Sequence, residues 1–563
     1  SAFDVCPRTK DALCERLGMS LMGKSSCRRT GVNGDPKTWK MSAQKIEKPG
    51  EACSMKSMKT LLVYPPFERL HGTQNRFFPI GLGYLAGALR RIGADVAIYN
   101  AENYDDEEGL ISGYRHTDVF KHHQDYQDAL DDPDHYVWRE VEQVLADYDA
   151  DIIGITVKSC MIPSAQAIAR IAKQLNPNVT VVWGGPHPSI CPEDTIQFDN
   201  VDFVVRHEGE ETIKQFVTMV ESGRKNWSEI DGLVWKNEAG DIVQNELRTN
   251  MQHVDEVDLP DKSVDLMPAR YSPDDLGVMF TSRGCPWPCT FCDSVGVWTR
   301  QIRYHSPEHI IDEMVRIYEH HGVRDFYFWD DTFTPNRKHS MRLFDMMIET
   351  FQAQGRPITW VATTRCDLVD DELARKMKES GCRLLTFGIE TGSPSMMKIL
   401  RKGITHEKVD HCSKVMQKAG ITWEAFFMMG FPDETLETAE ETMELIRKLG
   451  VVVAISLFTP YPGTEMYERA KSYGLLEEPI AWRHFSHQSP KNHFVKNVSR
   501  EVFSKVAFSY MQEIDNLNHK RYVRNRIGYY LKNPKKLPTK LLDMMKQRAL
   551  RVVPSKALGR GTA

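Results

Sequence analysis

The 563-residue chain lacks any uninterrupted apolar run close to the roughly 20 residues that a membrane-spanning helix needs. Its first residues also lack the apolar core of a secretory signal. A strong charge of either sign is absent, because 72 basic and 77 acidic residues nearly cancel to a net charge of -5. This balance gives no reason to expect nucleic-acid binding. We therefore expect a cytoplasmic protein without a nucleic-acid partner.

Cysteine is scarce, with 12 residues in the chain, which is too few for a disulfide framework. Three of them nevertheless cluster in "RGCPWPCTFC", where Cys285, Cys289 and Cys292 have the spacing C-x3-C-x2-C. Structural zinc normally takes four protein ligands, so a zinc site would need a fourth ligand such as His305. Three cysteines can hold a four-iron cluster and leave one iron open. The missing fourth thiolate therefore favours an iron-sulfur cluster.

Residues 1–57 differ from the rest of the chain because they are polar, rich in Lys, Ser and Gly, and without sustained periodicity. We interpret them as a polar N-terminal extension, and we expect the folded part to start near Met58. The extension contains four cysteines at spacings too irregular for a metal motif, namely Cys6, Cys14, Cys27 and Cys53.

Residues 58–225 alternate apolar runs with amphipathic stretches, starting with "TLLVYPP" and continuing through "DVAIYN", "DIIGITV", "VTVVWGG" and "VDFVVRHEGEE". This pattern predicts a doubly wound, Rossmann-like α/β domain with a parallel sheet covered on both faces. Ligands bind such domains in a crevice at the carboxyl ends of the strands. The residues that we expect there are Pro65, Ser159, Gly184, Gly185, His187 and Glu208.

Residues 226–272 read as a linker with a small hairpin, "GLVWKNEAGDIVQNE". A second series of six strands begins in the segment 273–475, and helical stretches follow the strands. Six units predict a partial (β/α)6 barrel, in which chemistry gathers at the carboxyl ends of the strands. The three clustered cysteines come directly after its first strand.

Residues 476–563 are predicted to form a helical, basic C-terminal region. From residue 520 onward this region has 13 Lys or Arg and one acidic residue, Asp543. Two interpretations stay open: contact of a basic amphipathic tail with an anionic membrane surface or partner, and a solvated helix.

The three-cysteine motif, with an aromatic residue before its last cysteine and a six-unit βα series around it, resembles the radical S-adenosylmethionine (SAM) superfamily. The later strand ends "FWDDTF", "TTRCD", "GIETGS", "MMGFPDET" and "TPYPGT" are similar to that family's pattern as well. In this family SAM binds the open iron of a 4Fe-4S cluster, and its reductive cleavage gives a 5'-deoxyadenosyl radical. The resemblance implies that Cys285, Cys289 and Cys292 hold the cluster.

The same resemblance implies a set of SAM contacts. The backbone of Phe291 would lie against the adenine, and Arg365 would pair with the SAM carboxylate. Asp330 and Asp331 stand where the family usually has a Gly-Gly-Glu element beside the SAM amino group. Glu390 and Ser393 fit contacts to the ribose or the methionyl part. Helix capping is the alternative role of Ser393 and Asp331.

The first domain resembles the cobalamin-binding domain of one large subclass of this family, on the residues "LLVYPP", "FPIGLGYLAGALRRIGADV", "WGGPHPS" and "VVRHEGEET". The D-x-H-x-x-G signature of a cobalt-ligating histidine is absent. The resemblance therefore implies base-off cobalamin without a histidine below the metal, with His187 as the one candidate exception. The cobalamin contacts would be the six crevice residues given above.

The implied activity is cobalamin-dependent radical methylation of an unactivated carbon or phosphorus centre. One alternative is a cyclase or oxidoreductase without methyl transfer, similar to the anaerobic tetrapyrrole cyclase. A less favoured one is a methylthiotransferase, because the first domain lacks three further cluster cysteines. The resemblance also implies an electron donor such as flavodoxin or ferredoxin, and a small-molecule or lipid-like substrate.

Overall fold

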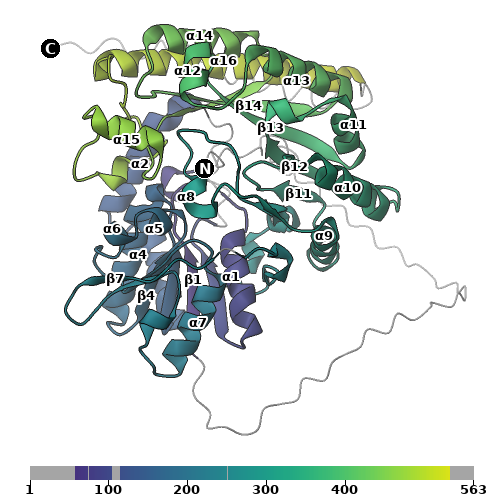
Figure 1. Ribbon diagram of the computed structural model, residues 1–563. Helices are drawn as coiled ribbons and strands as arrows, with labels where there is room; N and C mark the ends of the chain where they lie inside the picture. The colour runs from purple at the N-terminus through teal and green to yellow at the C-terminus, as the bar shows by residue number, and fades with distance from the viewer. Residues whose placement is uncertain (1–57, 74, 104–114, 250, 488, 533–563) are drawn as a thin grey trace, which may run out of the picture.

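The computed structural model describes residues 58–532 except 74, 104–114, 250 and 488. Figure 1 shows two α/β units packed against each other. The predicted N-terminal extension with its four cysteines, and residues 533–563 of the basic C-terminal region, lie outside the described residues. Within the described part of the chain, no helix combines the length and the apolar character needed to cross a membrane.

The first unit contains a seven-stranded sheet in the order β2-β1-β3-β4-β5-β6-β7. Its strands are β1 (Lys59–Tyr64), β2 (Asp95–Asn100), β3 (Ile152–Thr156), β4 (Thr180–Gly184), β5 (Phe203–Val205), β6 (Leu233–Lys236) and β7 (Ile242–Gln244). The first five in chain order are parallel, and β6 and β7 pair antiparallel. The hairpin that we predicted in the linker thus extends the first sheet and covers the edge of the short strand β5.

Helices cover both faces of this sheet, as the doubly wound pattern predicts. One face carries α1 (Ile80–Arg91) and α7 (Glu210–Glu221), and the other carries α3 (Tyr136–Tyr148) and α4 (Ile162–Leu175). Successive residues of β1 enter opposite cores: Leu61 and Val63 join one, and Leu62 joins the other. An additional helix, α2 (Val119–Asp131), precedes α3, and the short helices α5 (Pro186–Ile190) and α6 (Pro192–Thr195) follow β4.

The second unit contains six parallel strands in the order β15-β14-β13-β12-β11-β8, which confirms the partial barrel. The strands are β8 (Val278–Met279), β11 (Asp325–Phe328), β12 (Thr359–Thr364), β13 (Cys382–Glu390), β14 (Thr422–Met429) and β15 (Val452–Leu457). Its helices are α9 (Pro307–His321), α10 (Arg337–Met347), α11 (Asp371–Glu379), α12 (Pro394–Ile399), α13 (His406–Ala419), α14 (Leu436–Lys448) and α15 (Glu465–Ser472). Between β8 and α9 lie β9 (Ser282–Arg283), α8 (Ser294–Trp298) and β10 (Arg303–Tyr304).

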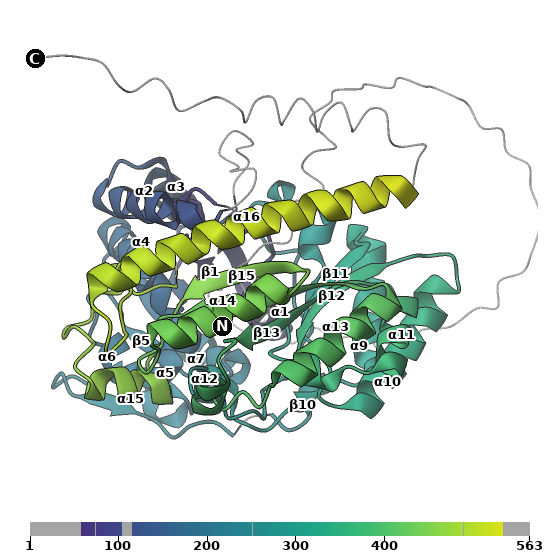
Figure 2. The same ribbon diagram turned by 90° about the horizontal axis from the view of Figure 1, so that it is seen from above.

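The open edge of the partial barrel, strand β15, is covered by side chains rather than by another strand. The long helix α16 (Arg500–Lys532) crosses this edge in Figure 2. Its residue Asn518 accepts from the backbone N–H of Val453 at 3.0 Å and donates to the same residue's carbonyl at 2.7 Å. His116, which belongs to the first unit's chain segment, accepts from the N–H of Ile455 at 3.2 Å. These bonds satisfy backbone groups that an edge strand leaves unpaired.

A partly buried group of ion pairs in the first unit predicts that the stability of the protein depends on pH. Glu140 accepts from Arg69 at 2.8 Å, from Arg270 at 2.9 Å and from the Tyr99 hydroxyl at 2.9 Å. Burial alone would raise the pKa of Glu140, but the two arginines lower it to about 2. Because this pKa lies below the unfolded value, the stabilisation is present above about pH 4.5 and disappears as the pH falls toward 2.

We expect Glu140→Gln to lower the free energy of unfolding at neutral pH by about 2 to 3 kcal/mol. The variant should also lose part of the acid dependence of the melting temperature between pH 4.5 and 3. Glu142→Gln, an exposed change on the same helix, is the matched control. Identical pH profiles for wild type and Glu140→Gln would contradict this account.

Candidate functional site

The three cysteines occupy a loop whose shape depends on its neighbours. Gly284 has φ 102, and a Cβ there would lie 2.4 Å from the carbonyl oxygen of Gln301, so that only glycine fits. The middle of the loop is fixed by Thr290, whose N–H donates to Leu400 at 3.1 Å and whose carbonyl accepts from Met466 at 3.0 Å. The loop is therefore held from α12 and α15, far along the sequence.

The cysteine thiols are free and half-buried, and their chemistry fits a metal cluster. Burial raises the pKa of Cys292 to about 12 and also raises the pKa of Cys285 and Cys289. Without metal the three side chains thus stay protonated at neutral pH, and an iron cluster would displace these protons on binding. Four other cysteines of the described residues are buried away from this loop, namely Cys160, Cys366, Cys382 and Cys412. The donor set of three thiols fits a cluster with one open iron.

The two aspartates after β11 have different roles. Asp330 is buried and accepts hydrogen bonds from Thr281 and Ser282, at 2.8 and 2.6 Å for the two hydroxyls. Burial raises the pKa of Asp330 to about 6. Through these hydrogen bonds, the carboxylate of Asp330 connects the end of β11 to the segment that precedes the cysteine loop. Asp331 instead accepts from Ser294 at the start of α8, and its charge raises the pKa of Cys285.

A buried pair of opposite charges lies at the carboxyl end of β13. Lys402 donates to Oε1 of Glu390 at 2.9 Å, while the buried Oε2 of Glu390 has no hydrogen-bond partner. Glu390 has φ 72, a left-handed backbone conformation that is strained for this residue type. A Cβ at Gly388 would lie 2.3 Å from Oε1, so the pair needs glycine beneath it. The orphaned oxygen fits a ligand with a positive donor, such as the SAM amino group.

Sequence reasoning missed Lys402. Burial would lower the pKa of this lysine, but Glu390 and Cys289 keep it above its ordinary value, so the side chain stays charged. Its Nζ also lies 5.8 Å from the ring centroid of Phe291. In the sequence this lysine stands in "LRKGIT", directly after α12. A lysine in such a polar stretch is ordinarily interpreted as a surface residue, so nothing in the sequence indicated its place beside Glu390.

Two further predicted SAM contacts have partners within the protein. Arg365 forms two bonds of 3.0 Å with Asp367, and its guanidinium lies 4.6 Å from the ring centroid of Trp287. Ser393 accepts from the N–H of Met396 at the start of α12, which is the capping role that we left open. Arg365 therefore lies beside the cysteine loop with its charge already balanced.

The predicted cobalamin contacts lie mostly at the carboxyl ends of β1, β3 and β4. Ser159 and Nδ1 of His187 are 3.0 Å apart, and the buried Nε2 of His187 has no hydrogen-bond partner. Gly185 has φ 98, and a Cβ there would lie 2.8 Å from the Thr156 hydroxyl. Pro65 directly follows β1, and Gly184 is the last residue of β4, at the same edge of the sheet. This edge fits a large ligand that requires close backbone approach.

Glu208 differs from the other five predicted contacts. Its carboxylate accepts from Arg283 at 3.0 Å and from Arg303 at 2.8 Å, and both arginines belong to the second unit. Burial raises the pKa of Glu208, but the arginines outweigh this effect and lower it overall. Glu208 is thus engaged at the boundary between the two units.

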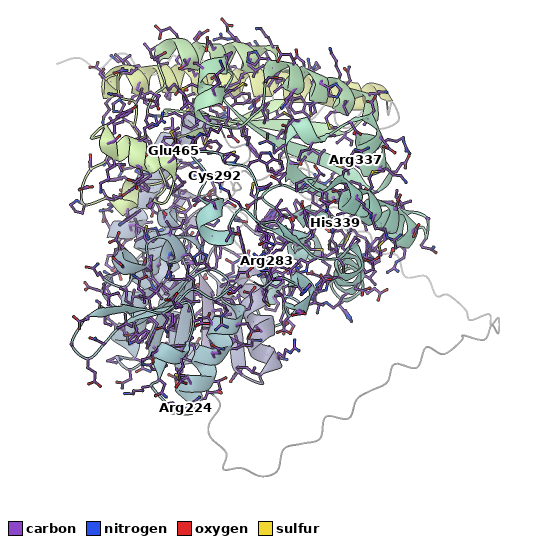
Figure 3. The ribbon with its side chains drawn as sticks, viewed as in Figure 1. Arg224, Arg283, Cys292, Arg337, His339 and Glu465 are labelled. Carbon is purple, nitrogen blue, oxygen red and sulfur yellow. The ribbon has the colours of Figure 1, made fainter. Side chains whose placement is uncertain are left out.

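The predicted cobalamin edge is in direct contact with α8, the helix that follows the cysteine loop. A Cβ at Gly296 in α8 would lie 2.9 Å from Ile190 of α5, and one at Gly463 would lie 2.6 Å from the same side chain. Nδ1 of His207 lies 3.1 Å from the carbonyl oxygen of Val297. Figure 3 shows Cys292 and Arg283 in the middle of the molecule, where the two units meet. A ligand on either edge would therefore face the other.

His305, the alternative zinc ligand, belongs to a separate group with Asp255 and His309, whose ligand atoms lie within 4.8 Å of one another. Asp255 already accepts from the N–H of Ser306 at 2.9 Å and lies 3.2 Å from Nδ1 of His305. The buried Nε2 of His305 has no partner, whereas metal-ligating histidines ordinarily have one that orients the ring. We therefore interpret this group as the N-terminal support of α9.

Sequence profiles of two families match the chain at the two units. The Radical SAM superfamily profile matches residues 279–446, and the B12 binding domain profile matches residues 72–217. A relative from Pyrococcus horikoshii, "Uncharacterized methyltransferase PH0819", is 35% identical over 468 residues, which cover 81% of this chain and 93% of the relative.

Two more distant proteins extend this similarity. Cytidylyl-2-hydroxyethylphosphonate methyltransferase from Streptomyces wedmorensis is 25% identical, over 78% of this chain and 86% of that protein. The solved structure of TsrM from Kitasatospora setae, a radical S-adenosylmethionine methyltransferase with cobalamin and a 4Fe-4S cluster bound, has a TM-score of 0.58 and 20% identity. That similarity covers 75% of this chain and 76% of TsrM, and it shows a shared fold.

Proposed function

The chain belongs to the cobalamin-dependent radical SAM enzymes, and we propose that it is a methyltransferase that acts on an unactivated carbon or phosphorus centre of a small molecule. The observation that carries this proposal is the contact between α5 at the predicted cobalamin edge and α8 after the cluster cysteines. A methyl donor on one edge and a hydrogen-abstracting group on the other would reach one substrate between them.

Each part of the site has a task that follows from its side chains. When bound, the cluster and SAM supply a carbon-centred radical, and cobalamin supplies the methyl group. The three thiolates would hold the iron, and the fixed backbone of Thr290 keeps the loop in place. Glu390 and Lys402 offer one negative and one positive group, which suits the zwitterionic methionyl end of SAM. Ile190 and its neighbours hold the two edges together.

Reduction of the cluster requires an electron donor. We propose a reduced flavodoxin or ferredoxin, because the half-buried cysteine loop leaves the cluster site within reach of a docked protein. In the small-molecule substrate, the atom that accepts the methyl group is a carbon or a phosphorus atom.

Product analysis tests the function. After anaerobic reconstitution with iron, sulfide and cobalamin, the reduced protein should convert SAM to S-adenosylhomocysteine in amounts matching the bound cobalamin. Addition of a methyl acceptor should give S-adenosylhomocysteine and 5'-deoxyadenosine together. Protein reconstituted without cobalamin is the control, and it should form only 5'-deoxyadenosine. The cyclase or oxidoreductase alternative predicts turnover with 5'-deoxyadenosine alone, even when cobalamin is bound.

A further inference from the structure

Four buried charges join the two units directly beside the cysteine loop. Arg283 of β9 donates to Glu208 at 3.0 Å and to Glu210 at 2.7 Å, and Arg303 of β10 donates to Glu208 at 2.8 Å. The side chains of both arginines are 3% exposed, and those of Glu208 and Glu210 are 6% and 8% exposed. Charges buried to this degree persist only when they are paired, so the four form one neutral group.

The two arginines cannot balance each other's charge, because both are positive. Arg283 and Arg303 are directly opposite in the antiparallel pair of β9 and β10, where like charges are destabilising. Glu208 bridges them, with one carboxylate oxygen to each. The short two-stranded ladder that begins the cysteine loop therefore depends on a carboxylate from the other unit.

Arg283 also lies close to the cluster ligands in the sequence, two positions before Cys285. Its guanidinium lies 5.0 Å from the ring centroid of Tyr84 and 5.5 Å from that of Trp298. A guanidinium stays protonated at any pH at which proteins are folded. A permanent positive charge thus lies at the start of the cysteine loop, and two carboxylates of the first unit neutralise it.

The segment that supplies these carboxylates is itself fixed to both edges. His207 has φ 57, a strained left-handed conformation. Its N–H donates to the Ser189 hydroxyl of α5 at 2.7 Å, and its ring lies against the carbonyl of Val297 in α8. The loop between β5 and α7 is therefore held at the cobalamin edge on one side and at the cysteine loop on the other.

We propose that Glu208 and Glu210 are positioning residues through which the first unit holds the cysteine loop, and that their charge lowers the reduction potential of the cluster. This inference rests on the proposed function for the presence of the cluster. Reduction adds an electron to the cluster, so unbalanced positive charge nearby favours the reduced form. The two carboxylates remove that imbalance, which keeps the reduced cluster a strong electron donor to SAM.

The test is a potentiometric titration of the full chain, reconstituted with iron and sulfide and followed by electron paramagnetic resonance, without SAM, cobalamin or substrate. Glu208→Gln keeps the side-chain shape and leaves one arginine charge unbalanced, so the midpoint potential should shift upward. The double variant Glu208→Gln/Arg303→Met restores neutrality and should bring the potential back toward the wild-type value. Glu211→Gln, a neighbouring change on α7, should leave it unchanged.

An unchanged midpoint potential in Glu208→Gln would overturn the inference and leave the methyltransferase function standing. A shift that the double variant does not reverse would overturn the charge argument, since a purely structural role predicts that result. If Glu208→Gln does not fold, Glu210→Gln gives the same test through the other bond to Arg283. A wild-type chain that forms no four-iron cluster would remove the proposed function together with this inference.

Discussion

A chain carrying Cys289→Ala is expected to lose SAM cleavage completely. The loop offers three thiols, and no other described cysteine lies in it, so that removal of one leaves two ligands for a cluster that needs three protein ligands. Leu400 and Met466 hold the loop through the backbone of Thr290, and the loop should therefore keep its shape after the change. The loss should appear as absence of 5'-deoxyadenosine and of the cluster's visible absorption after reconstitution.

The matched control is Cys412→Ala, which truncates a cysteine buried in the barrel core. It should lower stability by about 1 kcal/mol and keep both the absorption and the cleavage. Retained SAM cleavage by Cys289→Ala would refute the assignment of the cluster. Loss of cleavage in both variants would point to a damaged fold rather than to a missing ligand.

Lys402→Met is expected to weaken SAM binding by about 100-fold, the usual range for truncation of one partner of a buried, hydrogen-bonded charge pair. The lysine neutralises Glu390 at 2.9 Å and stays charged although it is buried. Without it, the SAM carboxylate would lose the positive group that we propose for it, and only the negative charge of Glu390 would remain. Equilibrium binding of SAM to the reconstituted protein measures the effect.

Removal of the lysine alone leaves Glu390 buried without a partner, at a cost of about 3 to 5 kcal/mol in stability. The double variant Glu390→Gln/Lys402→Met removes both charges, and it should recover stability without recovering SAM affinity. Lys398→Met, an exposed change on α12, is the control. If Lys402→Met binds SAM as tightly as the wild type, the pair has only a structural role.

Local sequence pattern was sufficient for the elements and for the loop that carries the three clustered cysteines. Apolar runs separated by amphipathic stretches have one stable arrangement, a parallel sheet covered by helices, and both units confirm it. The spacing of Cys285, Cys289 and Cys292 predicts a metal cluster without knowledge of the fold, since all three thiols lie in one loop. The hairpin of β6 and β7 was recognised, but its place on the first sheet was not, because strand pairing does not appear in a local pattern.

The contacts that escaped prediction join residues that are far apart in the sequence. Glu208 looked like a crevice residue by its place after β5, yet its partner Arg283 is 75 residues away. Lys402 is 12 residues from Glu390, and the two meet where the backbone of Glu390 has a left-handed conformation. Asp330 resembled a ligand contact and is instead used by Thr281, 49 residues earlier. Single-sequence patterns do not encode such pairs.

The covered edge of β15 bears on how this architecture can change in evolution. His116 reaches that strand from the first unit's chain, 339 residues before Ile455, and Asn518 reaches it from α16 after the barrel. The first unit thus contacts the barrel in two places: through His116 at β15, and through Glu208 at the pair of β9 and β10. We therefore expect that the two units are not readily exchanged one at a time between relatives. A barrel moved into another protein would need both the segment around His116 and helix α16 to cover the edge of β15.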